Sequence, residues 1–151
     1  LAILIYVFFR FNFSFAISAI TALFHDFLIA LFFIIFLDIE ITLSTIAALL
    51  TVIGYSVNDT IVIFDRVREN MNLLLDDKVE KIINISIIQT LSRTILTVIT
   101  VLIVLLPLYF FGGPVIEDFS IIMIIGVAVG TYSSIFFAPF LMYLISKWRT
   151  N

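Results

Sequence analysis

The stretch GYSVNDTIVIFDRVREN, residues 54–70, carries an acid, Asp59, into what is otherwise an apolar helix long enough to enter a membrane. A charged Asp at the centre of a transmembrane helix costs about 2.5–3.5 kcal/mol on insertion-based scales, so such a residue usually faces a protein interior and serves transport or proton transfer. Asp59 is therefore the first candidate functional residue of the chain.

The composition is that of an integral membrane protein. Of the 151 residues, 63% are hydrophobic and 13% are charged, and the mean hydropathy of +1.27 is too high for an ordinary soluble domain. The chain has no cysteine for a disulfide or a metal site, and its single histidine, His25, cannot build a multi-histidine site. We therefore predict no metal and no cofactor, and nothing in the sequence supports nucleic-acid binding.

Four apolar runs are long enough to cross a hydrocarbon core of about 30 Å at 1.5 Å per residue. We place these spans at residues 15–37, 41–64, 88–111 and 121–145. Residues 1–10 are predicted to be the end of a further helix whose beginning is missing. The predicted fold is therefore an all-α, polytopic bundle of about five transmembrane helices, the first one truncated, in one domain over residues 1–151.

The basic residues indicate the orientation of the bundle. All eight Lys and Arg residues fall on one side if every run crosses the membrane once, because they follow the first helix, lie in or beside residues 65–88, or follow the last helix. The two other loops, around residues 38–40 and 112–118, contain acids and no basic residue. Since cytoplasmic loops carry an excess of Lys and Arg, we predict that the C-terminus and an interfacial segment over residues 65–87 are cytoplasmic.

A second polar face is predicted on the helix at 15–37. Ser14, Ser18, Thr21 and His25 are spaced to share one side of that helix, with Asp26 next to it. That side should face protein or water. His25 and Asp26 are candidates for a proton relay, and a structural hydrogen-bonded pair is the alternative interpretation of the same two residues.

Arg93 stands near the cytoplasmic start of the helix at 88–111, where it either anchors the helix at the interface or reaches Asp59. Burial favours the neutral form of a carboxyl group, whereas a nearby cation favours the charged form. An Asp that moved between these surroundings would bind and release a proton, and each proton that crosses the membrane is worth about 2.3 kcal/mol per 100 mV. The hypothesis assigns this exchange to Asp59, with Arg93 as its partner.

Two further patterns have mainly structural interpretations. Small residues recur at every fourth position in the helix at 121–145 and predict close packing of a neighbouring helix, namely Gly126, Gly130, Ser134 and Ala138. After the helix at 41–64, Asp65 and Arg66 belong to a dense charged cluster, in which Asp65 and Arg68 have the spacing of a helical ion pair. Capping and topology explain most of that cluster.

The chain resembles a known family over nearly its whole length. The stretch that contains Gly54, Tyr55, Asn58, Asp65 and Arg66, followed by QTLSRT and LYFFGGPVIEDFS, resembles SecF, the smaller partner of the SecD–SecF protein-export complex. In that family, SecD and SecF form a pseudo-symmetric membrane unit of the resistance-nodulation-division superfamily beside the SecYEG channel. The resemblance implies half of such a unit, which uses the proton motive force to assist protein export across the bacterial cytoplasmic membrane.

The resemblance also implies roles for single residues and for partners. The family's membrane-embedded proton-pathway Asp matches Asp59, its partner Arg matches Arg93, and a His–Asp pair common in SecF matches His25 and Asp26. Protons are then the coupling ion, and the expected partners are SecD, the SecYEG translocon, exported preproteins and membrane lipid. The family's first transmembrane helix and periplasmic domain do not precede Leu1, so we expect a fragment without the domain that contacts preproteins.

Three other functions compete with this interpretation. A related exporter of lipids or drugs would share a proton-coupled membrane Asp. Asp26 and Asp59, on separate helices, are the two carboxylates that an intramembrane aspartyl protease requires, but the GxGD context is absent before Asp59, so we expect no enzymatic activity. The structural alternative is a scaffold for SecD, in which Asp59 only hydrogen-bonds between helices.

Overall fold

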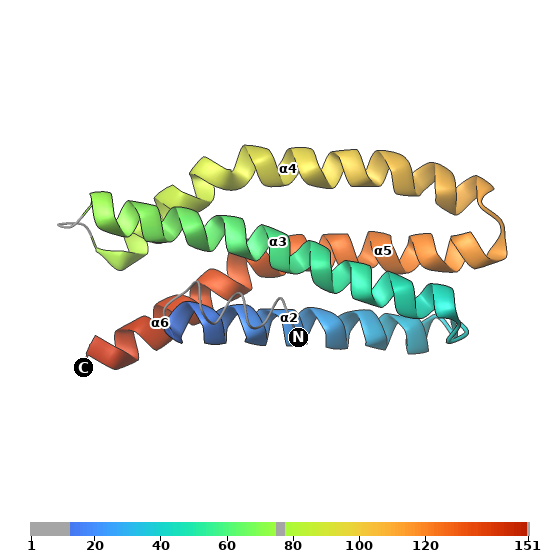
Figure 1. Ribbon diagram of the computed structural model, residues 1–151, viewed down its shortest axis with the longest axis horizontal. Helices are drawn as coiled ribbons and strands as arrows, with labels where there is room; N and C mark the ends of the chain where they lie inside the picture. Colours follow the sequence, from blue (N-terminus) through green and yellow to red (C-terminus); the bar gives the residue numbers. More distant parts are fainter. Residues whose placement is uncertain (1–12, 75–77, 151) are drawn as a thin grey trace.

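Every element of the described chain is helical. The computed structural model describes residues 13–74 and 78–150, and its elements in chain order are α2 (Phe13–Phe36), α3 (Leu43–Leu73), α4 (Val79–Phe111), α5 (Pro114–Tyr132), the π-helix η1 (Ser133–Phe137) and α6 (Ala138–Thr150) (Figure 1). Within these residues, four segments are long and apolar enough to cross a membrane, and α5, η1 and α6 together form the last of them. The predicted all-α membrane bundle is thus confirmed, while the helix expected at residues 1–10 lies outside the described residues.

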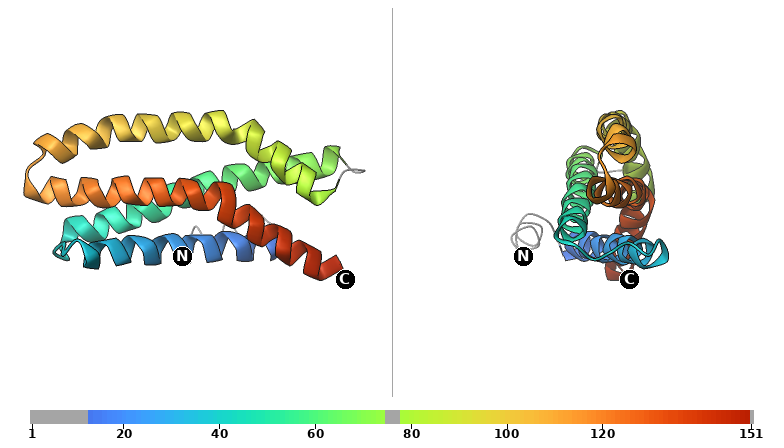
Figure 2. Two further views of the ribbon diagram at one scale, coloured as in Figure 1. Left: turned by 180° about the vertical axis from the view of Figure 1, so that it is seen from behind. Right: turned by 90° about the vertical axis from the view of Figure 1, so that its right-hand side faces the viewer.

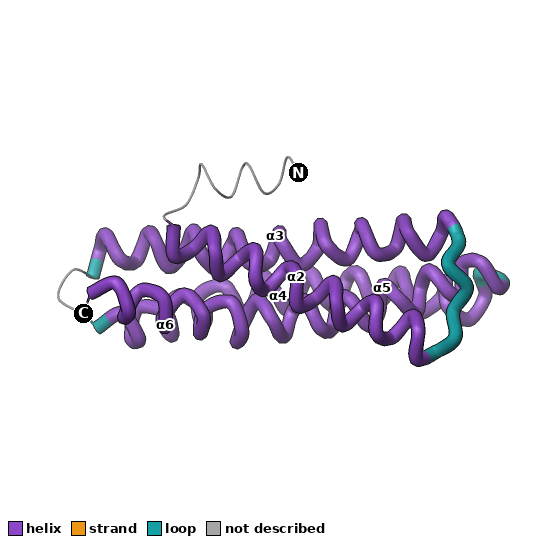
Figure 3. Tube along the Cα trace, turned by 90° about the horizontal axis from the view of Figure 1, so that it is seen from below, coloured by secondary structure: helices purple, strands orange, loops and turns teal. Residues whose placement is uncertain are grey.

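The four spans run antiparallel to their chain neighbours. The α2–α3 and α4–α5 connections lie at one end of the bundle, and the α3–α4 connection lies at the other end together with the end of α6 (Figures 1 and 3). Helices α3 and α5 form the centre, because each of them packs on both α2 and α4. Lys78 and Lys147 therefore lie at the end opposite Glu40 and Glu117, as a single crossing by each span requires.

Helices α3 and α4 are longer than their predicted ranges. α3 continues to Leu73 and α4 already begins at Val79, so most of residues 65–87, expected as an interfacial segment, belongs to these two helices. No Gly or Pro interrupts residues 55–106, so nothing in the backbone chemistry ends the helices at the membrane boundary. Buried side chains such as Val67 continue the packed face of α3 beyond that boundary.

The last span starts earlier than predicted and is bent. α5 begins at Pro114, a residue type favoured at the first helical position. Residues Ser133–Phe137 then form a π-helix, in which the Ala138 N–H bonds to the Ser133 carbonyl. Pro139 follows and has no N–H, so regular α-helical bonding cannot pass through this turn. Figure 2 shows the change of direction between α5 and α6.

The buried interior has three layers along the helices. One apolar cluster, which includes Phe64 and Met142, lies toward the α3–α4 connection, and another, which includes Val52 and Ile122, lies toward the opposite end. Between them, α2, α3 and the turn after α5 contribute buried polar residues, namely Asp26, Ser56, Asp59, Thr60, Ser133 and Ser134. Because buried polar groups are costly unless they are bonded, this polar layer contains the candidate site.

Helices α3 and α5 approach closely along the small-residue stripe. A Cβ atom on Gly126 would lie 2.1 Å from Val52 Cγ2, and one on Gly130 would lie 3.1 Å from Ser56 Cβ. The two other members of the stripe are also buried, namely Ser134 and Ala138. A side chain at position 126 would force α3 away, so the absence of one sets the distance between the two helices.

Candidate functional site

Asp26 is buried and hydrogen-bonded through both carboxyl oxygens. Its side chain is 1% exposed, and Oδ2 accepts hydrogen bonds from Ser56 Oγ and from Ser133 Oγ, the latter at 2.5 Å. His25 Nδ1 lies 3.0 Å from Asp26 Oδ1. The hydroxyl donors replace the water that a buried carboxyl group loses. One side chain of α2 is thereby fastened to α3 and to η1.

The π-helix brings two of its residues onto α2. Ser133, its first residue, reaches Asp26, and Phe137, its last, stacks on the His25 ring with the ring centroids 4.5 Å apart. Gly130, less than one turn before Ser133, lets α3 approach closely enough for both serines to reach the same oxygen. The wide turn is therefore part of the site, in a position where π-turns are often found in proteins.

Asp59 is buried without equivalent bonding. Its side chain is 4% exposed, and within residues 13–74 and 78–150 its Oδ2 finds no hydrogen-bond partner. The preceding Asn58 is exposed. The Tyr55 hydroxyl, one turn earlier on α3, is likewise buried without a partner in the described chain. An unpaired buried oxygen is costly, so this part of the polar layer differs in kind from the one around Asp26.

Arg93 of α4 faces the same contact between α3 and α4. It is the cation whose charge acts on Asp59, yet no ion pair joins the two side chains among the described residues. Arg93 also lines a polar pocket of about 380 Å³ between α3 and α4, together with Val62, Asp65, Arg66, Glu69, Gln89 and Thr90. A buried carboxyl group, a nearby cation and a polar opening are the parts that reversible protonation requires.

Hydrogen bonds fasten α3 to α4 on the connection side of this pocket. Gln89 Oε1 accepts from Arg66 Nε at 2.7 Å and from Asn70 Nδ2 at 2.9 Å. Asn70 Nδ2 also bonds to Ser86 Oγ at 2.8 Å, and Arg66 Nη1 pairs with Glu69 Oε2 at 2.5 Å. The charged cluster at the end of the Asp59 helix is therefore also a contact between two helices.

The candidate residues form two groups that contact different neighbours of α3. His25 and Asp26 lie on the side of α2 and η1, whereas Asp59 and Arg93 lie on the side of α4. No hydrogen bond joins the two acids in the described residues. Gly54 has open space where a Cβ atom would stand, so close packing does not explain this glycine. Nowhere in residues 13–74 and 78–150 do three His, Asp or Glu side chains gather as a metal site would need.

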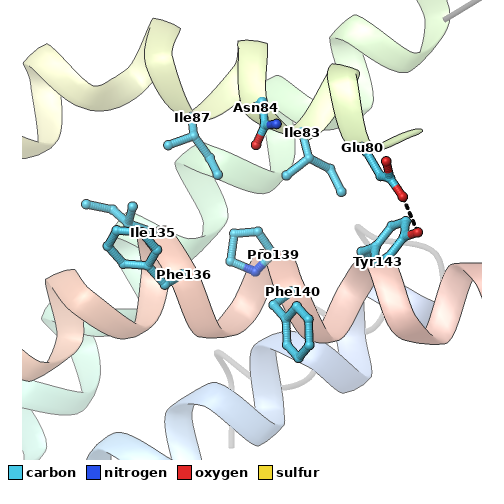
Figure 4. A pocket seen from close by; sticks show the side chains of 9 residues that line it. All are labelled: Glu80, Ile83, Asn84, Ile87, Ile135, Phe136, Pro139, Phe140 and Tyr143. Atoms are coloured by element: carbon cyan, nitrogen blue, oxygen red, sulfur yellow. Dashed lines mark hydrogen bonds between the residues drawn. The ribbon is translucent and has the colours of Figure 1, made fainter. Parts of the chain in front are cut away.

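A second groove lies away from both acids. Apolar side chains of α4 face those of η1 and α6 across a space of about 410 Å³, and the Tyr143 hydroxyl donates a hydrogen bond to Glu80 at one end (Figure 4). Its walls are mostly apolar, and neither Asp26 nor Asp59 lines it. The groove therefore has no part in acid–base chemistry at these residues.

The residues that complete both groups were missed from the sequence. Ser56 and Ser133 are ordinary small polar residues there, and only the meeting of three elements shows that they share one acceptor. Gln89 begins the QTLSRT stretch, but nothing in the sequence alone indicates its contacts with α3. Of the polar face expected on α2, Thr21 is exposed and bonds to its own helix backbone. Pro139, inside a predicted helix, was an available signal for the irregular turn.

Comparison with known proteins connects this arrangement with a family. Residues 1–148 match the family model described as protein export membrane protein SecD/SecF, C-terminal. The protein translocase subunit SecF of Rickettsia rickettsii is 50% identical over 148 residues, which are 97% of this chain and 48% of the relative. That of Rickettsia akari is 46% identical over 151 residues, which are 100% of this chain and 49% of the relative. The chain thus spans about half the length of the curated relatives it matches.

Solved structures share the fold. A crystal structure of SecDF in a super-membrane-facing form matches with a TM-score of 0.93 and 44% identity, over 97% of this chain and 20% of that one. The crystal structure of SecDF, a translocon-associated membrane protein, from Thermus thermophilus matches with a TM-score of 0.90 and 44% identity, over 98% and 20%. On this evidence the chain belongs to the SecD/SecF family of protein export membrane proteins and corresponds to the family's C-terminal membrane part.

Proposed function

We propose that this chain is the membrane part of a SecF-type subunit, which works with SecD to couple the proton motive force to protein translocation through the SecYEG channel. Two SecF relatives at 46% and 50% identity support the SecF type, and the match to SecDF structures supports SecD as the partner. The proposed location is the bacterial cytoplasmic membrane, with several crossings and a cytoplasmic C-terminus. Exported preproteins and SecYEG would meet the whole subunit.

Proton coupling rests on one observation, the buried and unpartnered carboxyl oxygen of Asp59 next to Arg93. A structural acid in this interior bonds to donors, as Asp26 does. An unbonded oxygen in a membrane interior is costly, and the cost falls either when the carboxyl group binds a proton or when it closes on the cation. Alternation of Asp59 between these two states is the proposed coupling step.

His25 and Asp26 fit the structural alternative better than a relay. Both Asp26 oxygens are occupied, and the acid holds α2, α3 and η1 together. An aspartyl protease is disfavoured for a related reason, because two carboxyl groups that share a proton must lie in contact, and Asp26 is turned to the serines instead. A lipid or drug exporter receives no support from relatives named as translocase subunits, and no enzymatic activity is proposed.

The test replaces Asp59 in the full-length subunit expressed with SecD. Asp59→Asn keeps the shape of the side chain but cannot exchange a proton, so secretion of a reporter that depends on the proton motive force should fall to the level of cells without the subunit. The control is Glu117→Gln. It removes the same charge from an exposed acid in the first turn of α5 and should leave secretion unchanged.

Membrane levels and copurification with SecD are measured for both variants. Loss of secretion in Asp59→Asn with an intact complex supports coupling through Asp59. Secretion at the parent level in that variant would refute the proposal and leave Asp59 as a structural residue between helices.

A further inference from the structure

One amide oxygen of α4 accepts two of the hydrogen bonds that join α3 to α4 next to Asp59. Gln89 Oε1 of α4 accepts a hydrogen bond from Arg66 Nε at 2.7 Å and another from Asn70 Nδ2 at 2.9 Å, both from α3. The orientation of this amide is fixed by chemistry, because a guanidinium group can only donate. The oxygen of Gln89 must therefore face Arg66, and Asn70 must present its NH₂ group.

This contact determines which part of α3 lies opposite Arg93. Gln89 and Arg93 are four residues apart and share a face of α4, about 6 Å apart along its axis. Because α3 runs antiparallel to α4, the step from Gln89 to Arg93 on α4 corresponds to the step from Arg66 back to Val62 on α3. Val62 and Arg93 accordingly line the same pocket. Asp59 lies nearly one further turn along α3. With Gln89 fastened, Arg93 is thus held short of Asp59, which agrees with the absence of an ion pair between them in the described residues.

Gln89 also occupies a competing cation. Arg66 lies two turns from Asp59 on the same side of α3 and lines the pocket that Arg93 lines. Its guanidinium is bound by Gln89 at 2.7 Å and by Glu69 at 2.5 Å, on the side of the pocket away from Asp59. With Arg66 occupied, Arg93 is the cation that acts on the buried acid.

We propose that Gln89 is a positioning residue for the Asp59–Arg93 pair: by binding Arg66 and Asn70 it holds Arg93 one turn short of Asp59, so that the carboxyl group stays free to take up a proton. The proposal rests on the function proposed for Asp59. Without the amide oxygen, the Asn70–Ser86 bond alone remains of these contacts, so the register of α4 on α3 is held less firmly and Arg93 closes on Asp59. The closed pair holds Asp59 in its charged form and stops the alternation that drives export.

The test uses Gln89→Leu in the full-length subunit with SecD. Leu has a similar volume to Gln but no hydrogen-bond acceptor. Because loss of a hydrogen bond to a charged group shifts an equilibrium about tenfold or more, proton-motive-force-dependent secretion should fall about tenfold. Gln89→Glu keeps an acceptor for Arg66 and Asn70 and should restore secretion. The matched control is Ile88→Ala, which alters the neighbouring residue of α4, 70% exposed on the outer surface, and should secrete as the parent does.

A thiol label reports the register of the helices independently of export. The chain contains no cysteine, so Val62→Cys places a thiol of its own in the α3–α4 pocket. Its reaction with a water-soluble maleimide should be about tenfold faster with Gln89→Leu than with Gln89, because Arg93 then leaves its place beside Val62 to close on Asp59 and no longer covers the thiol. Asn70→Leu removes the second donor to Gln89 Oε1 and should also raise the labelling rate of Val62→Cys. This variant provides the test if Gln89→Leu fails to accumulate.

The outcomes separate the two proposals. Loss of secretion in both Asp59→Asn and Gln89→Leu, with rescue by Gln89→Glu, supports the positioning role. Loss in Asp59→Asn with parent secretion and an unchanged labelling rate in Gln89→Leu overturns the role of Gln89 alone. An equal loss in Gln89→Leu and Gln89→Glu also overturns it, because the acceptor oxygen would then be irrelevant. Parent secretion in Asp59→Asn overturns the coupling function and this inference together.

Discussion

Asp26 and Asp59 are buried in one polar layer but are bonded in opposite ways. Asp26 accepts hydrogen bonds from Ser56 and Ser133, whereas Asp59 Oδ2 has no partner in the described chain. Hydropathy marks both as unusual acids in apolar helices and cannot rank them. Their hydrogen bonds do rank the two acids, because nearly all buried polar groups in proteins are hydrogen-bonded and an exception needs an explanation.

The bonding around Asp26 predicts a difference between two substitutions. Asp26→Ala leaves the hydroxyls of Ser56 and Ser133 without their acceptor, at about 1–3 kcal/mol for each unsatisfied donor. Asp26→Asn keeps an acceptor oxygen for the serines and presents an NH₂ group to His25, so its cost should be within about 1 kcal/mol. Thermal unfolding of the purified complex with SecD, followed at several heating rates, measures both.

Equal losses in Asp26→Ala and Asp26→Asn would contradict this account, because the negative charge, and not the acceptor, would then hold the three elements together. Ser133→Ala serves as the control from the other side of the bond. It removes a donor and leaves Asp26 bonded to Ser56 and His25, so it should cost less than Asp26→Ala does.

At the scale of elements, α3 and α5 pack closely at Gly126. A Cβ atom at position 126 would lie 2.1 Å from Val52 Cγ2, so Gly126→Ala should destabilise the complex by about 1–3 kcal/mol through overpacking. Val52→Ala removes the clashing methyl groups, and the double variant should be more stable than the sum of the two single effects predicts. Thermal unfolding of the four members of this cycle provides the measurement.

Gly54→Ala is the matched control for that cycle. It makes the same chemical change on α3 where a Cβ atom meets nothing within 4 Å, so only the better helix propensity of alanine remains, worth up to about 1 kcal/mol in favour of the variant. A loss of stability at position 54 equal to that at position 126 would show that contact with Val52 is not the cause.

The sequence was sufficient for the existence of the helices and insufficient for their details. Long apolar runs predict spans because a bilayer core requires about 20 apolar residues. Helices α3 and α4 nevertheless continue past the predicted membrane boundary, where packed side chains such as Val67 are buried, and hydropathy does not contain this packing. The hydrogen bond of Ser133, at the start of the π-turn, reaches Asp26, 107 residues away, and no local pattern indicates that partner. The approach of Arg93 to Asp59 similarly depends on the register that Gln89 sets, and no local pattern encodes it.

At the scale of the whole molecule, the outer surface is apolar and the charges gather at the ends. Large exposed hydrophobic side chains occur on every span, including Phe32, Leu50, Val104 and Phe136, as expected for helices that face lipid or the membrane helices of a partner. The polar layer lies between two apolar clusters and therefore near the middle of the membrane. Protonation there requires a path from one membrane face, and the α3 residues that line the α3–α4 pocket all lie between Asp59 and the α3–α4 connection.

The orientation of the bundle gives a prediction about the whole molecule. The ends with basic residues should be cytoplasmic, so single cysteines replacing the exposed Lys78 and Lys147 should react with a membrane-impermeant thiol reagent in inside-out vesicles. Cysteines replacing the exposed Glu40 and Glu117, at the other end, should react in intact spheroplasts instead. Because each span crosses once, the four positions must divide two and two. Reaction of Lys78→Cys and Lys147→Cys from opposite sides would contradict the antiparallel arrangement, whereas reversal of both pairs together would preserve the fold and place the α3–α4 pocket on the outer face.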